Sequence, residues 1–202
     1  MKKIVFIPVM FLIIMWLINI LQFVLLIDLG TLGIHPRDSA SLFGILTSPL
    51  IHGNWEHLTS NSLPILILGV LLFLIYDKIA IWVWILNYIF TGLLVWLFAR
   101  DSYHIGASGI IYGLASFLFF SGVFRMDIKS IAIASGVAIF YGGMVWGILP
   151  IQPGVSWESH LFGGIVGFIL AYLFRNTHKD EIIQSHEEET ITRKSFDDFL
   201  NR

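Results

Sequence analysis

The feature that most constrains this chain is an uncharged stretch near its start. No charged residue occurs between Lys3 and Asp28, and the stretch contains the run VFIPVMFLIIMWLINILQFVLLI. It exceeds the ~20 apolar residues that a helix needs to cross a bilayer. It is also too long for the apolar core of a cleaved signal peptide, and no small-residue cleavage site follows it. We therefore expect a retained transmembrane helix and a membrane protein.

The rest of the chain extends this prediction to a bundle of helices. Only 13% of the 202 residues are charged and 56% are hydrophobic, whereas soluble domains carry about a quarter charged residues. Further apolar stretches at 57–76, 79–99, 106–124, 130–149 and 159–174 bring the expected number of spans to six. The longer connection, residues 29–54, is rich in glycine, proline and serine, which argues against a continuous helix.

The positions of lysine and arginine predict the orientation in the membrane. With the N-terminus inside, the cytoplasmic side holds Lys2, Lys3, Lys78, Arg125, Lys129, Arg175, Lys179, Arg193, Lys194 and Arg202. Only Arg37 and Arg100 fall outside. Both termini are thus expected in the cytoplasm, with residues 1–175 forming the six-span domain and 176–202 a polar cytosolic tail. The basic residues form no cluster, so we expect no nucleic-acid partner.

Polar residues occur at the starts of three of the expected spans. In this topology spans two, four and six all begin at the outer face. Span two opens with His52, His57 and Asn61, span four with Ser108, and span six with His160. Ionisable groups are expensive inside a membrane and usually mark a functional site. The sequence therefore predicts one polar site near the outer boundary.

Local spacing refines this prediction for span two. Asn54 is a good N-cap, and Glu56 in the first turn suits the helix dipole. His57 and Asn61 are four residues apart and share a helix face. His52 precedes the cap, so we expect it to brace the loop.

Two GxxxG pairs suggest how the serine meets the last histidine. Gly109 and Gly113 follow Ser108, and Gly163 and Gly167 follow His160. Small residues allow membrane helices to approach closely. Close packing of these two spans would bring Ser108 and His160 within hydrogen-bonding reach.

These residues match the needs of peptide hydrolysis. A serine hydroxyl becomes a nucleophile when a base accepts its proton, and the resulting oxyanion needs hydrogen-bond donors. His57, Asn61 and the backbone N–H of Ser108 are candidate donors. The nearby acids Asp101 and Glu158 are expected to be solvated loop residues, which favours a Ser–His dyad over a triad.

Other uses of the same residues stay open at this point. Ser108 could be a small packing residue, and His57 and Asn61 could be interhelical hydrogen-bonding groups. The buried histidines could serve a transporter or channel. A zinc site from the histidines is conceivable, but the chain lacks the HExxH pattern of metalloproteases, and cysteine is absent. We expect no metal and no cofactor.

Together the motifs resemble those of the rhomboid family of intramembrane serine proteases. They are the H-x4-H-x3-N pattern of His52, His57 and Asn61; Gly106-Ala107-Ser108-Gly109 with Tyr112; and His160 followed by Gly163 and Gly167. The resemblance covers roughly residues 5–175. The Trp-Arg pair that rhomboids with a long first loop often carry is missing from residues 29–54, which leaves open how this loop packs.

The resemblance implies a six-span all-α fold and a set of roles. Ser108 would be the nucleophile and His160 the general base. His57 and Asn61, with the Ser108 amide, would form the oxyanion hole; Tyr112 would stack on His160, and His52 and Gly106 would support the site. The substrates would be single-span membrane proteins, cut near the outer face of a bacterial plasma membrane. The alternative is a non-catalytic rhomboid-like protein that binds membrane helices.

Overall fold

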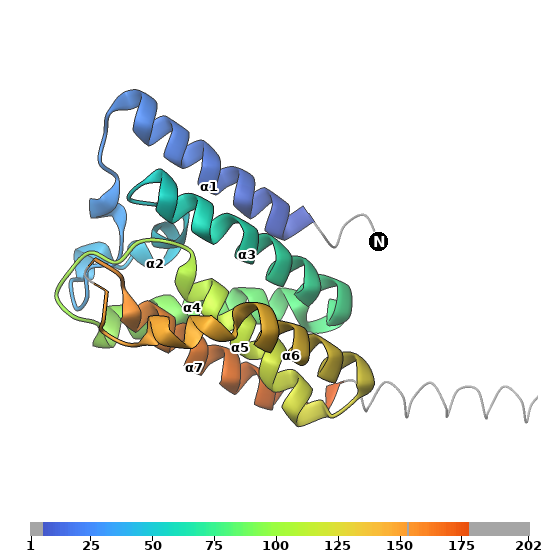
Figure 1. The fold of residues 1–202 in the computed structure, drawn as a ribbon. Helices are drawn as coiled ribbons and strands as arrows, with labels where there is room; N and C mark the ends of the chain where they lie inside the picture. The colour runs from blue at the N-terminus through green and yellow to red at the C-terminus, as the bar shows by residue number, and fades with distance from the viewer. Residues whose placement is uncertain (1–5, 153, 178–202) are drawn as a thin grey trace, which may run out of the picture.

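A computed structural model describes residues 6–152 and 154–177, and every regular element in them is helical (Figure 1). The α-helices are α1 (Phe6–Leu25), α2 (Gly44–Thr47), α3 (Trp55–Ile75), α4 (Asp77–Phe98), α5 (Ser108–Arg125), α6 (Ile128–Tyr141) and α7 (Trp157–Leu173). Short 3-10 helices cover Gly30–Leu32, Ser39–Ser41, Ser48–Leu50 and Gly142–Ile148. The predicted all-α class is confirmed, whereas Lys2, Lys3 and nearly all of the expected tail at 176–202 lie outside the described residues.

Each predicted span overlaps a helix, with two differences in detail. Within the described residues, five helices are long and apolar enough to cross a membrane: α1, α3, α4, α5 and the stretch Ile128–Ile148. The helix of the expected sixth span, α7, has 17 residues and is shorter. The expected span at 130–149 is present as the apolar stretch Ile128–Ile148, but within it α6 ends at Tyr141 and a 3-10 helix follows. Gly142 and Gly143 stand at this change, and glycine is a poor residue for an α-helix interior.

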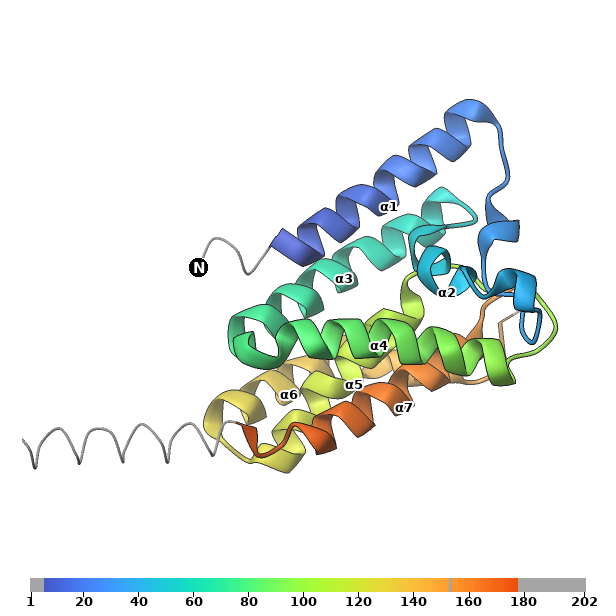
Figure 2. The same cartoon turned by 180° about the vertical axis from the view of Figure 1, so that it is seen from behind.

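The helices surround α5, which contributes the largest share of buried residues among the long helices. Its side chains Leu114, Phe117 and Leu118 are fully buried. Helix α1 packs on α3 at one edge of the molecule, α6 and α7 flank α5 at the other, and α4 crosses the face seen in Figure 2. A serine at the start of α5 therefore lies where several helices meet.

Two glycines of α7 contact the backbone of α5 directly. A methyl group at Gly163 would overlap the carbonyl oxygen of Gly109, and one at Gly167 would overlap that of Gly113. The close approach expected from the two GxxxG pairs is therefore present. Such contact gains dispersion energy over many atom pairs and leaves no room for a side chain.

Residues 26–54 form an irregular segment that packs against α4 and the α4–α5 loop, as Figure 2 shows around α2. The Arg37 guanidinium donates to the carbonyl of Ala99 over 2.7 Å, and the Trp96 indole donates to the carbonyl of Asp38 over 2.9 Å. Ile34 pairs with His104 in a single antiparallel bridge. These contacts bind the segment to the core without a Trp-Arg pair. The end of the molecule that carries these loops is called the loop end below.

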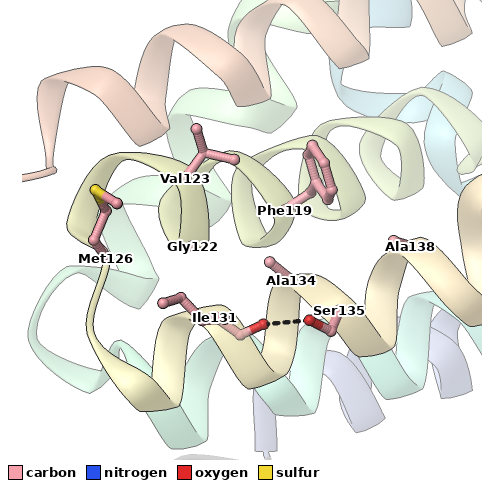
Figure 3. Close-up of a pocket in the computed structure, with 8 residues that line it drawn as sticks. All are labelled: Phe119, Gly122, Val123, Met126, Ile131, Ala134, Ser135 and Ala138. Atoms are coloured by element: carbon pink, nitrogen blue, oxygen red, sulfur yellow. Dashed lines mark hydrogen bonds between the residues drawn. The ribbon is translucent and has the colours of Figure 1, made fainter.

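At the opposite end α6 is attached through small and polar residues. The Tyr76 hydroxyl lies 3.1 Å from Ser130 Oγ, and Arg125 stacks over the Tyr76 ring while donating to the carbonyl of Phe174. Beyond this attachment α5 and α6 border an apolar groove of about 370 Å³ (Figure 3). The Ser135 hydroxyl in this groove donates a hydrogen bond to the carbonyl of Ile131.

The glycine contact predicts a position-specific effect on stability. Gly163→Ala should destabilise the fold by about 1–3 kcal/mol, because the added methyl group must push α7 away from backbone atoms of α5. The measurement is the thermal unfolding midpoint in detergent. Gly164→Ala is the matched control, since its methyl group meets nothing within 4 Å. Equal midpoints for the two variants would contradict the proposed packing.

Candidate active site

Ser108 stands at the N-terminus of α5, directly after a tight turn. Gly106 has φ of +105°, a conformation that favours glycine, and its N–H donates to the carbonyl of Ser48 over 2.8 Å. A side chain at Gly106 would also overlap the ring of His57. Ser108 is the first helical residue, so its N–H has no acceptor within the helix and points out of the helix end.

His160 reaches Ser108 from the first turn of α7. The distance from His160 Nε2 to Ser108 Oγ is 2.8 Å, and that from Nδ1 to the carbonyl oxygen of Gly147 is also 2.8 Å. A carbonyl only accepts, so Nδ1 carries the proton and Nε2 is left to accept from the serine hydroxyl. The imidazole is 8% exposed. This tautomer is the one a general base needs.

Tyr112 covers one face of the His160 ring. The two ring centroids are 4.1 Å apart and the planes differ by 4°. The Tyr112 hydroxyl donates to the carbonyl of Met144 over 2.7 Å. Tyr112 and His160 are thus each held by a carbonyl of the 3-10 helix Gly142–Ile148.

His57 and Asn61 lie on α3, whose start is fixed by its cap. Asn54 accepts from the N–H of His57 over 2.8 Å, as expected for the N-cap. The Asn61 amide donates to the carbonyl of His57 over 2.7 Å. Asn61 is buried and His57 half-buried. One of the two amide protons of Asn61 is used in this bond, which leaves the other for a further acceptor.

His52 lies just before α3 and behind the turn that carries Ser108. Its Nε2 is 3.5 Å from the backbone N of Ala107, and its ring lies edge-on to that of His57 with centroids 4.9 Å apart. The side chain is 1% exposed. Burial lowers the pKa of His52 to about 3, and the neighbouring His57 acts in the same direction. The neutral ring therefore supports the loop.

One of the two nearby acids differs from what the sequence suggested. Glu158 was expected to be solvated, but it lies in the first turn of α7 and is 3% exposed, with Oε1 3.6 Å from Nε of Arg100. His104, in the loop before α5, is buried and lies 2.6 Å from Ser156 Oγ. The expectation for Asp101 is confirmed: its side chain is 80% exposed and pairs with His35.

The carbonyls of Gly147 and Met144 are the contacts that sequence reasoning missed. Every residue supplies a carbonyl, so no residue type marks the one that will orient a base. Among the described residues, no group of three histidine, aspartate or glutamate side chains could hold a metal ion.

Comparison with known proteins identifies sequences that are similar to this chain. The profile of the rhomboid domain matches residues 39–177. An uncharacterized protein of Mycobacterium tuberculosis is 37% identical over 150 residues, which cover 70% of this chain and 62% of the relative. An uncharacterized Mycobacterium leprae protein is 35% identical over 81% of this chain and 68% of its own length. The rhomboid-like protein 11 of Arabidopsis thaliana chloroplasts is 28% identical over 65% of this chain and 52% of its own length. The chain therefore spans less than two thirds of the length of the Mycobacterium tuberculosis relative.

The buried loop histidines predict a loss of stability in acid. Burial lowers the pKa of His52 and of His104 below the usual 6.5, so below that pH the unfolded chain takes up protons that the folded chain does not. Stability is therefore complete above pH 6.5 and falls as the pH drops towards 4, by about 1.4 kcal/mol per pH unit for each such proton. The measurement is the unfolding midpoint between pH 7.5 and 4.5. A slope in His52→Gln as steep as in the wild type would contradict the assignment to His52.

Proposed function

Because the chain belongs to the rhomboid family, we propose that it is an intramembrane serine endopeptidase that cleaves transmembrane protein substrates near the outer membrane face. The observation that carries the proposal is the 2.8 Å contact between Ser108 Oγ and His160 Nε2. The Gly147 carbonyl supports it by fixing the tautomer that leaves Nε2 free to accept a proton.

The first half of the proposed reaction transfers the acyl part of the substrate to Ser108. Ser108 Oγ attacks the carbonyl carbon of the scissile peptide bond while His160 Nε2 takes the hydroxyl proton. The tetrahedral intermediate then collapses, and His160 returns this proton to the departing amine nitrogen. The C–N bond breaks, and the new C–O bond leaves an ester on Ser108.

The second half hydrolyses this ester. His160 Nε2 takes a proton from a water molecule, which attacks the ester carbonyl. Collapse of the second intermediate returns the proton to Ser108 Oγ and releases a carboxylic acid. The Gly147 carbonyl keeps the Nδ1 proton in place throughout, so the ring becomes a cation in each intermediate and is stabilised by that acceptor.

We place the oxyanion hole at the start of α5, next to α3. The N–H of Ser108 has no acceptor within α5 because it lies at the helix N-terminus, where the helix dipole favours negative charge. His57 packs on Gly106, two residues before the nucleophile. Asn61 donates one amide proton to the His57 carbonyl and has a second that could be donated to the oxyanion. These three groups are the proposed hydrogen-bond donors to the oxyanion. The fold would hold each of them in position before the negative charge develops.

We further propose six spans with both termini in the cytoplasm. The helix ends opposite the site carry four basic residues: Lys78 and Lys129, the second residues of α4 and α6, Arg125, the last residue of α5, and Arg175, just after α7. Arg37 and Arg100 lie in the segments at the loop end. This distribution follows the positive-inside rule when the site faces outward. The 17 residues of α7 rise about 25 Å, slightly less than the ~30 Å hydrocarbon core. Labelling of engineered cysteines from each side of the membrane would test the orientation.

The alternative is a non-catalytic rhomboid-like protein that binds membrane helices. It explains the fold equally well. It gives no reason for a serine, a histidine and an oriented Nδ1–H to occur in one hydrogen-bonded chain.

The proposal predicts cleavage of a single-span membrane substrate by the purified protein in detergent or liposomes. Ser108→Ala and His160→Ala should each lower kcat/KM by about 10³-fold or more, since nucleophile and base act as a unit. Product is measured on gels and by mass spectrometry.

Ser121→Ala is the matched control, because Ser121 is a buried serine of the same helix and should leave kcat/KM unchanged. A wild-type protein that binds the substrate helix without cutting it would favour the non-catalytic alternative. Equal cleavage by Ser108→Ala would contradict the role of this serine.

The stacked ring of Tyr112 predicts a graded effect on kcat. Tyr112→Leu removes the aromatic contact with His160 and should lower kcat by about two- to tenfold, in line with the roughly 0.5–1.5 kcal/mol of an aromatic pair. Tyr112→Phe keeps the ring and loses only the bond to the Met144 carbonyl, so its kcat should stay closer to the wild-type value. A larger loss in the phenylalanine variant than in the leucine variant would contradict a stacking role.

A further inference from the structure

Two short segments at the loop end are joined to each other directly before the residues that react. The first runs from Arg100 to His104 and leads into Ser108; the second runs from Val155 to Glu158 and leads into His160. The Arg100 guanidinium donates to the carbonyl of Val155 over 2.7 Å. We call the five residues that join the two segments the clasp: Arg100, His104, Val155, Ser156 and Glu158.

A buried carboxylate forms the first half of the clasp. The Glu158 side chain is 4% exposed, and Oε1 lies 3.6 Å from Nε of Arg100 and 3.4 Å from its backbone N. Oε2 is buried with no hydrogen-bond partner in the described part of the chain. A buried charge is costly unless it is compensated. Arg100 and the N-terminus of α7 supply that compensation, so Glu158 holds Arg100 against α7.

A histidine and a serine form the second half. His104 Nε2 is 3.1 Å from the carbonyl oxygen of Arg100, and Nδ1 is 2.6 Å from Ser156 Oγ. The carbonyl only accepts, so Nε2 carries the proton and Nδ1 accepts from the Ser156 hydroxyl. Ser156 is also the N-cap of α7, where its Oγ accepts from the N–H of Ser159. One hydroxyl thus connects the start of α7 to the α4–α5 loop.

The clasp acts where the glycine contacts do not. Gly163 and Gly167 fix the distance between α5 and α7 inside the helices, but His160 lies one turn before Gly163, and Ser108 is the first residue of its helix. Helix ends fray and rotate more readily than helix centres. The clasp joins the segments that precede α5 and α7. Ser108 and His160 therefore lie between the clasp and the glycine contacts of the two helices.

We propose that the clasp sets the distance and orientation between Ser108 and His160, with Arg100, Glu158 and His104 as positioning residues. This inference rests on the proposed protease function. None of the three residues touches the reacting atoms; each acts through the loop or helix end that carries Ser108 or His160. A misplacement of about 1 Å between reacting groups can cost on the order of 100-fold in rate.

The test compares kcat per active site in the wild type and in five variants of the full chain. Active sites are titrated with a fluorophosphonate probe, and cleavage of a single-span substrate gives kcat and KM. Arg100→Gln leaves the buried Glu158 carboxylate without its partner and should lower kcat roughly 10- to 100-fold with little change in KM. Glu158→Ala should do the same. Glu158→Gln keeps the acceptor for the backbone N of Arg100 and should retain more activity than Glu158→Ala.

A double variant and a matched control sharpen the comparison. In Arg100→Gln/Glu158→Gln no charge is buried, so kcat should recover from the level of Arg100→Gln to that of Glu158→Gln. Asp101→Asn is the control, since this acid lies in the same loop and its side chain is 80% exposed. It should leave kcat per site unchanged.

The outcomes separate this inference from the function on which it rests. If the wild type does not cleave, the proposed function fails. If the wild type cleaves in a Ser108-dependent manner while Arg100→Gln and Glu158→Ala keep the wild-type kcat per titrated site, only the positioning role is overturned. The same holds if these variants lower only the number of titratable sites and the unfolding midpoint, since that is the result of a purely structural contact.

Discussion

The backbone contact between α5 and α7 is the interaction on which the site depends. Gly163 packs on the carbonyl of Gly109 and Gly167 on that of Gly113, so the two helices approach as closely as their backbones allow. Without a hydrophobic driving force between helices in lipid, such small-residue packing is a principal source of association. The same contact brings the start of α7 to the start of α5, where Ser108 and His160 form a 2.8 Å hydrogen bond. The glycines that pack the two helices together are therefore also the residues that bring the proposed nucleophile and base into contact.

The surroundings of this bond are built from backbone groups and neutral rings. Two carbonyls of the 3-10 helix Gly142–Ile148 accept hydrogen bonds, one from His160 and the other from Tyr112. His52 supports the turn before Ser108 as a neutral imidazole. The nearest buried carboxylate, Glu158, is directed to Arg100 and not to His160. A buried carboxylate carries a desolvation cost of its own, which a paired charge must offset. The Gly147 carbonyl dipole orients the base, and the Glu158 carboxylate pairs with Arg100 in the segments that precede Ser108 and His160.

The sequence predicted much of this arrangement because its strongest signals are local. Apolar runs located the helices, Asn54 was identified as a cap, and the two GxxxG pairs indicated which helices approach each other. The roles of Tyr112 and Gly106 came from resemblance to a family and not from spacing. The sequence failed where the outcome depends on tertiary contacts: Glu158 is polar and near a loop, and only the fold shows that Arg100 reaches it. The carbonyls of Gly147 and Met144 carry no residue-type signal, and the break in α6 at Gly142 was hidden within an apolar run.

We propose that close packing of α5 and α7 makes one serine, Ser108, nucleophilic. The most direct measurement is to treat the intact protein with a fluorophosphonate and to locate the adduct by peptide mass spectrometry. We predict a single adduct on Ser108, which disappears in His160→Ala although that variant remains folded. An adduct on another serine, or labelling of Ser108 that does not depend on His160, would contradict it.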